Sequence, residues 1–258
     1  MTDREPPYPA VRRDGVLRVG RPGTEWLSSG WNGGRRHTDC VYNVSVPDGW
    51  SRTDLEVYAG ERLERAGFER ENGESPVLFT GVDLEHARGA QCGSVTAYAT
   101  AGLSNPAQLP MEAAGRSLPD ESDRSDERTR PGTGTVNLVV GTTRALAPGA
   151  LANLLAVAVE AKATTLLTET GFPGTTTDAV VVGHDPSGEP TPFSGSGTRV
   201  GAATRACVRE AVRASLRSRY GGDAEIPGSV DDATYGTSTD ASATVFRPPL
   251  ASVDPRET

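Results

Sequence analysis

The pattern of apolar and polar positions is clearest between residues 134 and 178. Residues 135–143 are rich in β-branched side chains, which predicts a buried strand. Pro148 follows, where a first helical turn tolerates a missing amide hydrogen, and an almost unbroken apolar run of about five turns predicts a long buried helix. A glycine- and threonine-rich loop then leads to another strand at 179–183. This order of strand, helix and strand predicts the core of an α/β protein.

Lys162 lies on the inward face of this predicted helix. The same face holds, at steps of three and four positions, Leu151, Leu155, Ala158, Leu166 and Glu169. Lys162 is the only lysine of the chain, and the other 25 of its 26 Lys and Arg residues are arginine. A buried ammonium needs a carboxylate, because desolvating an unpaired charge costs several kcal/mol. Glu160 lies on the opposite side of the helix and Glu169 lies two turns away, so Asp178 is the predicted partner.

Shorter elements are predicted on both sides of this core. Strands are expected at 16–19, 25–29, 40–46, 77–82 and 93–100, and helices at 54–66 and 200–219. Thr53 is the predicted cap of the first of these helices, with Glu56 at the capping-box position. Asp83 is expected to cap a short helical turn, and the sequence DPSGEP predicts a turn.

These elements predict the fold class α/β (mixed α+β): a single layered domain with a mixed β-sheet covered by helices. We expect this domain to occupy residues 15–220. The Pro-rich residues 1–14, the acidic insertion at 107–133 and the polar, acidic tail at 221–258 are predicted to be disordered.

The composition limits the partners and the compartment. A net charge of -8 argues against nucleic acid, which needs clustered positive charge. Acidic excess, near-absence of lysine and 5% aromatic residues suggest adaptation to concentrated salt, although a GC-rich genome would also replace lysine by arginine. Three widely spaced cysteines make a disulfide framework improbable. No segment was expected to reach the ~20 apolar residues of a membrane helix, so we predict a cytoplasmic protein without a membrane partner and of unspecified oligomeric state.

Several sequence blocks occur in an order that resembles a known family. They are SSGWNGG, YNVSVP, FTGVD, TAYATAGLSNP, GTVN, EAKATTLL, GTTTDAVVV and GSGTRVG. Over about residues 27–215 the chain resembles the adenosylcobinamide amidohydrolases, which are corrinoid-salvage enzymes of archaea and some bacteria. The resemblance implies hydrolysis of the amide between aminopropanol and the propionate side chain of the corrin ring, giving adenosylcobyric acid and 1-amino-2-propanol. No resident cofactor is expected, since the corrinoid substrate itself carries the cobalt.

Amide hydrolysis needs a nucleophile, donors for the oxyanion and an acid for the leaving amine. Lys162 is predicted to be a base or an electrostatic stabiliser that Asp178 orients. A structural ion pair, or a lysine stem that reaches solvent, is an equal alternative. Thr135 offers a hydroxyl as nucleophile or donor, although a threonine in a strand needs no such role.

Further residues of the same blocks are predicted to bind the corrinoid. They are Asn43, Asn105, Asn137, Gly33, Gly34 and Thr177. An asparagine offers both a donor and an acceptor to the amide groups around a corrin, and glycine lets the backbone approach a bulky ligand. Turn formation is the alternative, and it is strongest for Asn105, which precedes a proline.

Other reactive groups fit known sites poorly. The histidines, His37, His86 and His184, lack a metal-ligand spacing such as H-E-x-x-H, so no metal site is predicted. The sequence DLEHARG has one residue too many for the D-x-H-x-x-G pattern of corrinoid ligands, and GSGTRVG lacks the G-x-S-x-G order of a serine nucleophile.

Two other functions remain compatible with the sequence. A corrinoid carrier or sensor without catalysis would use the same glycine- and asparagine-rich loops, and an amidase unrelated to cobalamin could share the scaffold. Release of aminopropanol from adenosylcobinamide distinguishes the hydrolase from both.

Overall fold

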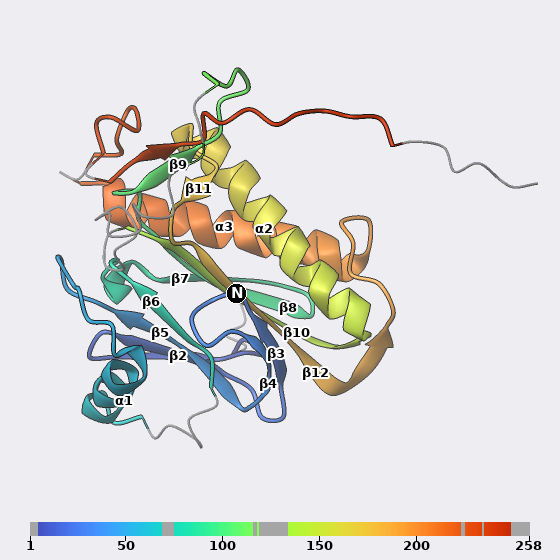
Figure 1. Cartoon of the computed structure of the whole chain (residues 1–258). Helices are drawn as coiled ribbons and strands as arrows, with labels where there is room; N and C mark the ends of the chain where they lie inside the picture. Colours follow the sequence, from blue (N-terminus) through green and yellow to red (C-terminus); the bar gives the residue numbers. More distant parts are fainter. Residues whose placement is uncertain are drawn as a thin grey trace, which may run out of the picture.

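Two β-sheets stack face to face, and helices cover their outer faces (Figure 1). The computed structural model describes residues 5–68, 75–115, 118, 134–222, 225–233 and 235–248. The first sheet has the order β1-β2-β5-β6, with β1 at Ala10–Arg13, β2 at Val16–Gly20, β5 at Cys40–Ser45 and β6 at Val77–Thr80. The second has the order β4-β3-β12-β10-β8-β7, with bounds Gly34–His37, Glu25–Ser28, Ala179–Thr191, Val136–Leu146, Val95–Ala101 and Arg88–Cys92. A third, small sheet has the order β11-β9-β13, from Gly174–Thr175, Pro106–Gln108 and Thr237–Ser238.

Three hydrophobic clusters separate the layers. Helix α1 (Leu55–Arg65) packs on the first sheet through a cluster that includes Leu63 and Trp50. A middle cluster between the sheets includes Trp26 and Val181. Helices α2 (Pro148–Thr170) and α3 (Arg199–Tyr220) cover the far face of the second sheet through the largest cluster. The layers therefore run helix, sheet, sheet, helices. This confirms the predicted mixed α/β class, but the strands belong to several sheets and not to the single mixed sheet that was predicted.

Strand β10, helix α2 and strand β12 form the predicted central unit. β10 and β12 are parallel neighbours in the middle of the six-stranded sheet, and α2 provides the crossover that parallel strands require. The left-handed Gly171 ends α2 with a φ of 80°. Because β10 and β12 run in the same direction, the residues just before both strands lie at one edge of the sheet.

The sequence located the long elements well and the short, polar ones poorly. The strands predicted at 16–19, 25–29, 40–46, 77–82 and 93–100 correspond to β2, β3, β5, β6 and β8, and the helices predicted at 54–66 and 200–219 correspond to α1 and α3. The turn predicted for DPSGEP is wrong, because β12 continues through it to Thr191, with an irregularity in its pairing to β10 between His184 and Glu189. Asp54 precedes α1 in place of the predicted cap Thr53, and its carboxylate accepts from Arg52 and makes no capping hydrogen bond to the helix. Asp83 does cap the short helix η1 (Leu84–His86), where its side chain accepts from the Glu85 N–H.

The two ends of the chain are more ordered than predicted. Tyr8 is fully buried, donates to the Thr142 carbonyl at 2.9 Å and meets Trp26 edge to face, and β1 follows it. Part of the tail pairs with β9 as β13. Disorder is therefore wrong for residues 8–13 and 237–238, and β9 lies at the start of the predicted insertion. Residues 1–4, 119–133 and 249–258 lie outside the described residues.

Helix α2 has the length and the mean hydropathy of a membrane span, so the expectation that no segment reaches that length is wrong. Half of its most apolar window, 50%, is buried inside the protein. The core helix of a soluble protein meets the same criteria, and α2 packs on α3 and on the six-stranded sheet. Its apolar character is therefore explained by packing within the fold.

We expect Tyr8→Ala to lower the free energy of unfolding by about 3–5 kcal/mol, because it opens a cavity between the sheets and leaves the Thr142 carbonyl without its donor. Urea unfolding at fixed molar salt measures the loss. Phe246→Ala is the control, since that ring is 79% exposed and its removal should change stability by less than about 0.5 kcal/mol. Equal, small effects would contradict the packing of the N-terminal segment.

Candidate functional site

The carboxylate of Asp178 accepts hydrogen bonds from three separate segments. Its Oδ1 accepts from the backbone N–H of Val136 at 2.9 Å and from the hydroxyl of Thr175 at 2.5 Å. Its Oδ2 accepts from the backbone N–H of Thr175 at 3.1 Å and from the ammonium of Lys162. The predicted partners Lys162 and Asp178 are thus in contact, and the starts of β10 and β12 meet α2 at one side chain.

The ion pair of Lys162 and Asp178 is buried. The two side chains are 7% and 11% exposed. Gly174 in β11 makes the contact possible, since a Cβ there would lie 2.6 Å from Asp178 Oδ2 and 3.4 Å from Lys162 Nζ.

Asn43 and Asn137 join the two sheets. The Asn137 amide donates to Asn43 Oδ1 at 3.0 Å and to the Phe79 carbonyl at 2.9 Å, and the Asn43 amide donates to Thr100 Oγ1 at 3.0 Å. Both asparagines are buried. These contacts pin the first sheet to the second beside the ion pair, while the predicted contact of either asparagine with substrate stays a prediction.

Thr135 lies where this chain of amides meets the ion pair. Its Oγ1 lies 2.9 Å from the Thr177 carbonyl and 3.3 Å from Asn137 Oδ1. The following residue, Val136, is the one whose N–H binds Asp178. The side chains of Thr135 and Asn137 thus contact each other, those of Lys162 and Asp178 contact each other, and the Val136 backbone lies between the two pairs.

Asn105 belongs to the same region but is only partly satisfied. Its Nδ2 donates to Thr176 Oγ1 at 2.7 Å and to Thr177 Oγ1 at 3.2 Å. Its Oδ1 is buried and has no hydrogen-bond partner among the residues that the structure describes. A buried acceptor without a donor costs about 1–3 kcal/mol, so this loop carries a polar group that the protein leaves unpaired.

Gly33 is the last residue of the connection between β3 and β4, and Gly34 is the first residue of β4. A Cβ at Gly33 would lie 2.6 Å from the Ser28 carbonyl oxygen, and Gly34 has a φ of 92°. Ser29 anchors the loop to the start of β12, where its N–H donates to the Val180 carbonyl at 3.0 Å. The loop lies near the polar edge of the sheet, but turn geometry by itself requires both glycines.

Two of the three histidines, His86 and His184, have structural contacts of their own. His86 Nδ1 lies 3.1 Å from Ser218 Oγ. His184 Nδ1 accepts from the Leu146 N–H at 3.0 Å, and burial lowers the pKa of His184. Within the described part of the chain, no three His, Cys, Asp or Glu residues are grouped as a metal site would need.

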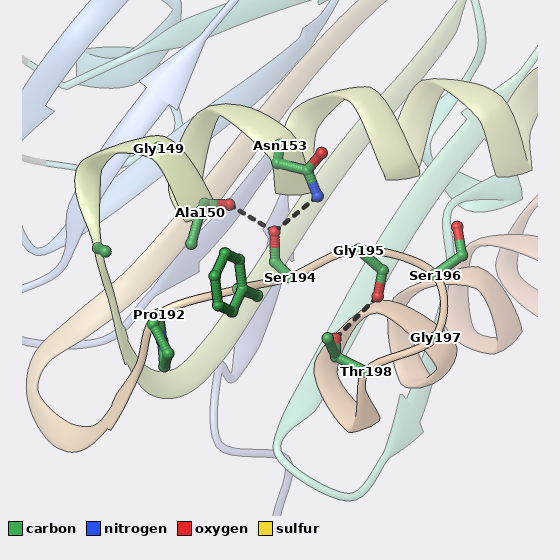
Figure 2. Close-up of a pocket in the computed structure, with 11 residues that line it drawn as sticks. Gly149, Ala150, Asn153, Pro192, Ser194, Gly195, Ser196, Gly197 and Thr198 are labelled. Carbon is green, nitrogen blue, oxygen red and sulfur yellow. Dashed lines mark hydrogen bonds between the residues drawn. The ribbon is translucent and has the colours of Figure 1, made fainter.

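One surface cavity, of about 480 Å³, opens between the first turns of α2 and α3. Figure 2 shows Ser194 between Ala150 and Asn153 at its wall: the hydroxyl donates to the Ala150 carbonyl at 2.6 Å and accepts from the Asn153 amide at 3.1 Å. Ser194 is 1% exposed. Its hydroxyl therefore holds the segment that precedes the GSGTRVG block on α2.

A second cavity, of about 490 Å³, was not predicted from the sequence. It lies beside the polar side chains at the start of β10, namely Thr135, Asn137, Lys162 and Asp178, which we call the polar cluster. Its walls include Leu103 and Ser104, the end of α3 with Arg219 and Tyr220, and part of residues 225–233. Ser104 Oγ accepts from the N–H of Gly134, the residue before Thr135. Sequence reasoning missed this cavity because only tertiary packing brings the end of α3 and the tail to the loop after β8.

Comparison with known proteins gives consistent matches. The family described as adenosylcobinamide amidohydrolase matches residues 3–224. A curated protein of that name from Halobacterium salinarum is 58% identical over 241 residues, covering 93% of this chain and 100% of that protein. Another from Methanosarcina mazei is 28% identical over 206 residues, covering 76% and 91%. The PH0078 protein from Pyrococcus horikoshii OT3 aligns with a TM-score of 0.41 at 12% identity over 84% of this chain and 82% of that one, too distant to support an argument.

We expect Lys162→Met to lower the free energy of unfolding by about 3–5 kcal/mol, because it leaves the Asp178 carboxylate buried without its cation. Adding Asp178→Asn should recover part of this loss. Urea unfolding of the single and double variants at fixed salt measures both effects. Arg205→Met is the control, since it removes an exposed pair with Glu160 that is worth less than about 1 kcal/mol. Similar losses of stability for Lys162→Met and Arg205→Met would contradict a strong buried pair.

Proposed function

The chain belongs to the adenosylcobinamide amidohydrolase family, and we propose that it hydrolyses the amide between aminopropanol and the corrin propionate of adenosylcobinamide. The products are adenosylcobyric acid and 1-amino-2-propanol. The observation that carries this proposal is the 58% identity to the halobacterial amidohydrolase along its whole length. That relationship also supports the resemblance deduced from the ordered sequence blocks.

The polar cluster at the start of β10 supplies groups that such a reaction needs. Water must replace the amine at the carbonyl carbon, and the departing nitrogen must gain a proton. Thr135 is proposed to act on the reacting amide as nucleophile or as hydrogen-bond donor, for which its hydroxyl must exchange the Thr177 carbonyl for the substrate. Lys162 and Asp178 act on it indirectly: Asp178 holds the Val136 N–H, which fixes the backbone next to Thr135, and Lys162 balances the charge of Asp178.

The asparagines have two distinct proposed roles. Asn43 and Asn137 position the two sheets around Thr135, because their donors are bound inside the protein. Asn105, with its unpaired oxygen next to Thr176 and Thr177, is the group best suited to receive an N–H of the substrate. The absence of a resident cofactor and a cytoplasmic location remain predictions.

The purified protein should release 1-amino-2-propanol from adenosylcobinamide in molar salt. Chromatography with mass detection of both products checks this. The salt is included because excess negative charge destabilises a compact protein through self-repulsion. Tight binding of the corrinoid without release of aminopropanol would favour a carrier or sensor. A protein that neither bound the corrinoid nor released aminopropanol would contradict any corrinoid function.

Thr135→Ala should lower kcat by about 10²-fold or more, and Thr135→Ser should retain a substantial part of the activity, since it keeps the hydroxyl. Thr168→Ala is the control, because the Thr168 side chain lies on the exposed face of α2 and, among the described residues, bonds only to the Thr164 carbonyl. Steady-state kinetics measure the loss, and mass spectra of acid-quenched enzyme reveal any acyl-enzyme. Unchanged kcat in Thr135→Ala would exclude a direct role.

A further inference from the structure

The cavity beside Ser104 contains hydrogen-bond donors that have no acceptor within the described part of the chain. Arg219 Nε is buried without a hydrogen-bond partner, and among the described residues the guanidinium pairs with no carboxylate. Its Cζ lies 5.6 Å from the centroid of the Tyr220 ring. An arginine whose charge stays unpaired at the wall of a cavity offers its donors to a ligand.

Two hydroxyl groups extend this set of donors. The Tyr220 oxygen accepts from the Leu103 N–H at 2.8 Å, and Ser104 Oγ accepts from the Gly134 N–H. In both cases the hydroxyl oxygen acts as the acceptor, so its own hydrogen remains available, and no acceptor for it is recorded among the described residues. Arg219, Tyr220 and Ser104 thus line one cavity with donors.

The donor set indicates the class of ligand. A guanidinium with two hydroxyl groups suits an oxyanion or a polarised carbonyl oxygen. Glu225 and Asp232 also line the cavity, and their negative charge disfavours a ligand with several anionic groups. A single carboxylate, or the carbonyl oxygen from which it forms, fits these conditions.

The position of the cavity connects it to the proposed reaction. Ser104 holds the N–H of Gly134, whose neighbour Thr135 belongs to the polar cluster, and the residue after Ser104 is Asn105. The loop that lines the cavity therefore continues directly into the candidate site. A volume of about 490 Å³ accommodates one side arm of a corrinoid, within the usual range of ligand pockets.

We propose that Arg219, together with the Tyr220 and Ser104 hydroxyls, binds the carbonyl oxygen of the scissile amide and then the carboxylate of the product. This inference rests on the proposed amide hydrolysis. Negative charge develops on that oxygen as the carbonyl carbon becomes tetrahedral, so donors placed there stabilise the transition state more than the neutral substrate. After cleavage of the C–N bond the same donors hold the carboxylate.

Arg219 also has a simpler role available, since basic residues in a last helical turn interact favourably with the helix dipole. Arg217 lies in the same turn, is exposed and does not line the cavity. Arg217→Gln is therefore a matched control for Arg219→Gln: a dipole effect would be shared by both variants, and a ligand effect would occur in one.

The test compares binding of adenosylcobyric acid, the carboxylate product, to the full-length variants by calorimetry in molar salt. Arg219→Gln should weaken this binding about 10-fold to 100-fold and lower kcat about 10²-fold, with a smaller change in KM for the neutral substrate. Arg217→Gln should behave as the unmodified protein. Arg219→Lys, which keeps the charge but loses the planar fork, should bind the product with intermediate affinity.

Unchanged product binding in Arg219→Gln, or an equal loss in Arg217→Gln, would overturn the proposal. If Arg219→Gln does not fold, as judged by circular dichroism, product binding by Arg219→Lys that equals that of the unmodified protein would overturn it. Calorimetry needs no turnover, so the two proposals can fail separately. Arg219-dependent product binding in a protein that releases no aminopropanol would contradict the hydrolase and retain the carboxylate site.

Discussion

The carboxylate of Asp178 is the point on which the central unit of this fold depends. A β-α-β crossover fixes the direction of its two strands but does not by itself join the segments where the strands begin. Here one side chain joins them by hydrogen bonds. It binds the backbone of β10, the turn at β11 and the ammonium of α2 at the same time. The contact is possible because a glycine, Gly174, passes beside it.

The sequence predicted this pair because helix geometry left few choices. Once Lys162 was placed on a buried face, no carboxylate of its own helix was within reach, and Asp178 followed. Local patterns could not predict the packing of Tyr8, since it depends on a distant glycine: a Cβ at Gly141 would lie 2.5 Å from the Tyr8 ring. The cavity at Arg219 depends in the same way on tertiary contacts of the tail, such as that from Tyr235 N–H to the Ser104 carbonyl.

The proposed site combines a closed interior with an accessible margin. The side chains around Thr135 are nearly inaccessible, so a macrocyclic substrate cannot lie among them. The reacting bond of a corrinoid, however, belongs to a side arm at the edge of the ring. A cavity of limited volume next to a rigid polar cluster suits that geometry, because the arm enters while the ring stays outside. Rigid support from the sheets then fixes the orientation of the groups that meet the arm.

The single lysine of the chain is explained by the same packing. Elsewhere arginine serves as the basic residue, and on the surface its larger, planar head meets no steric limit. At position 162 the side chain is 7% exposed and its nitrogen would lie only 3.4 Å from a Cβ at Gly174. A compact ammonium fits between Asp178 and the backbone of β11, whereas a guanidinium needs space for a planar fork and partners for five N–H donors. The presence of lysine and not arginine at position 162 therefore has the same physical cause as the geometry of the buried ion pair: the small size of the lysine head group.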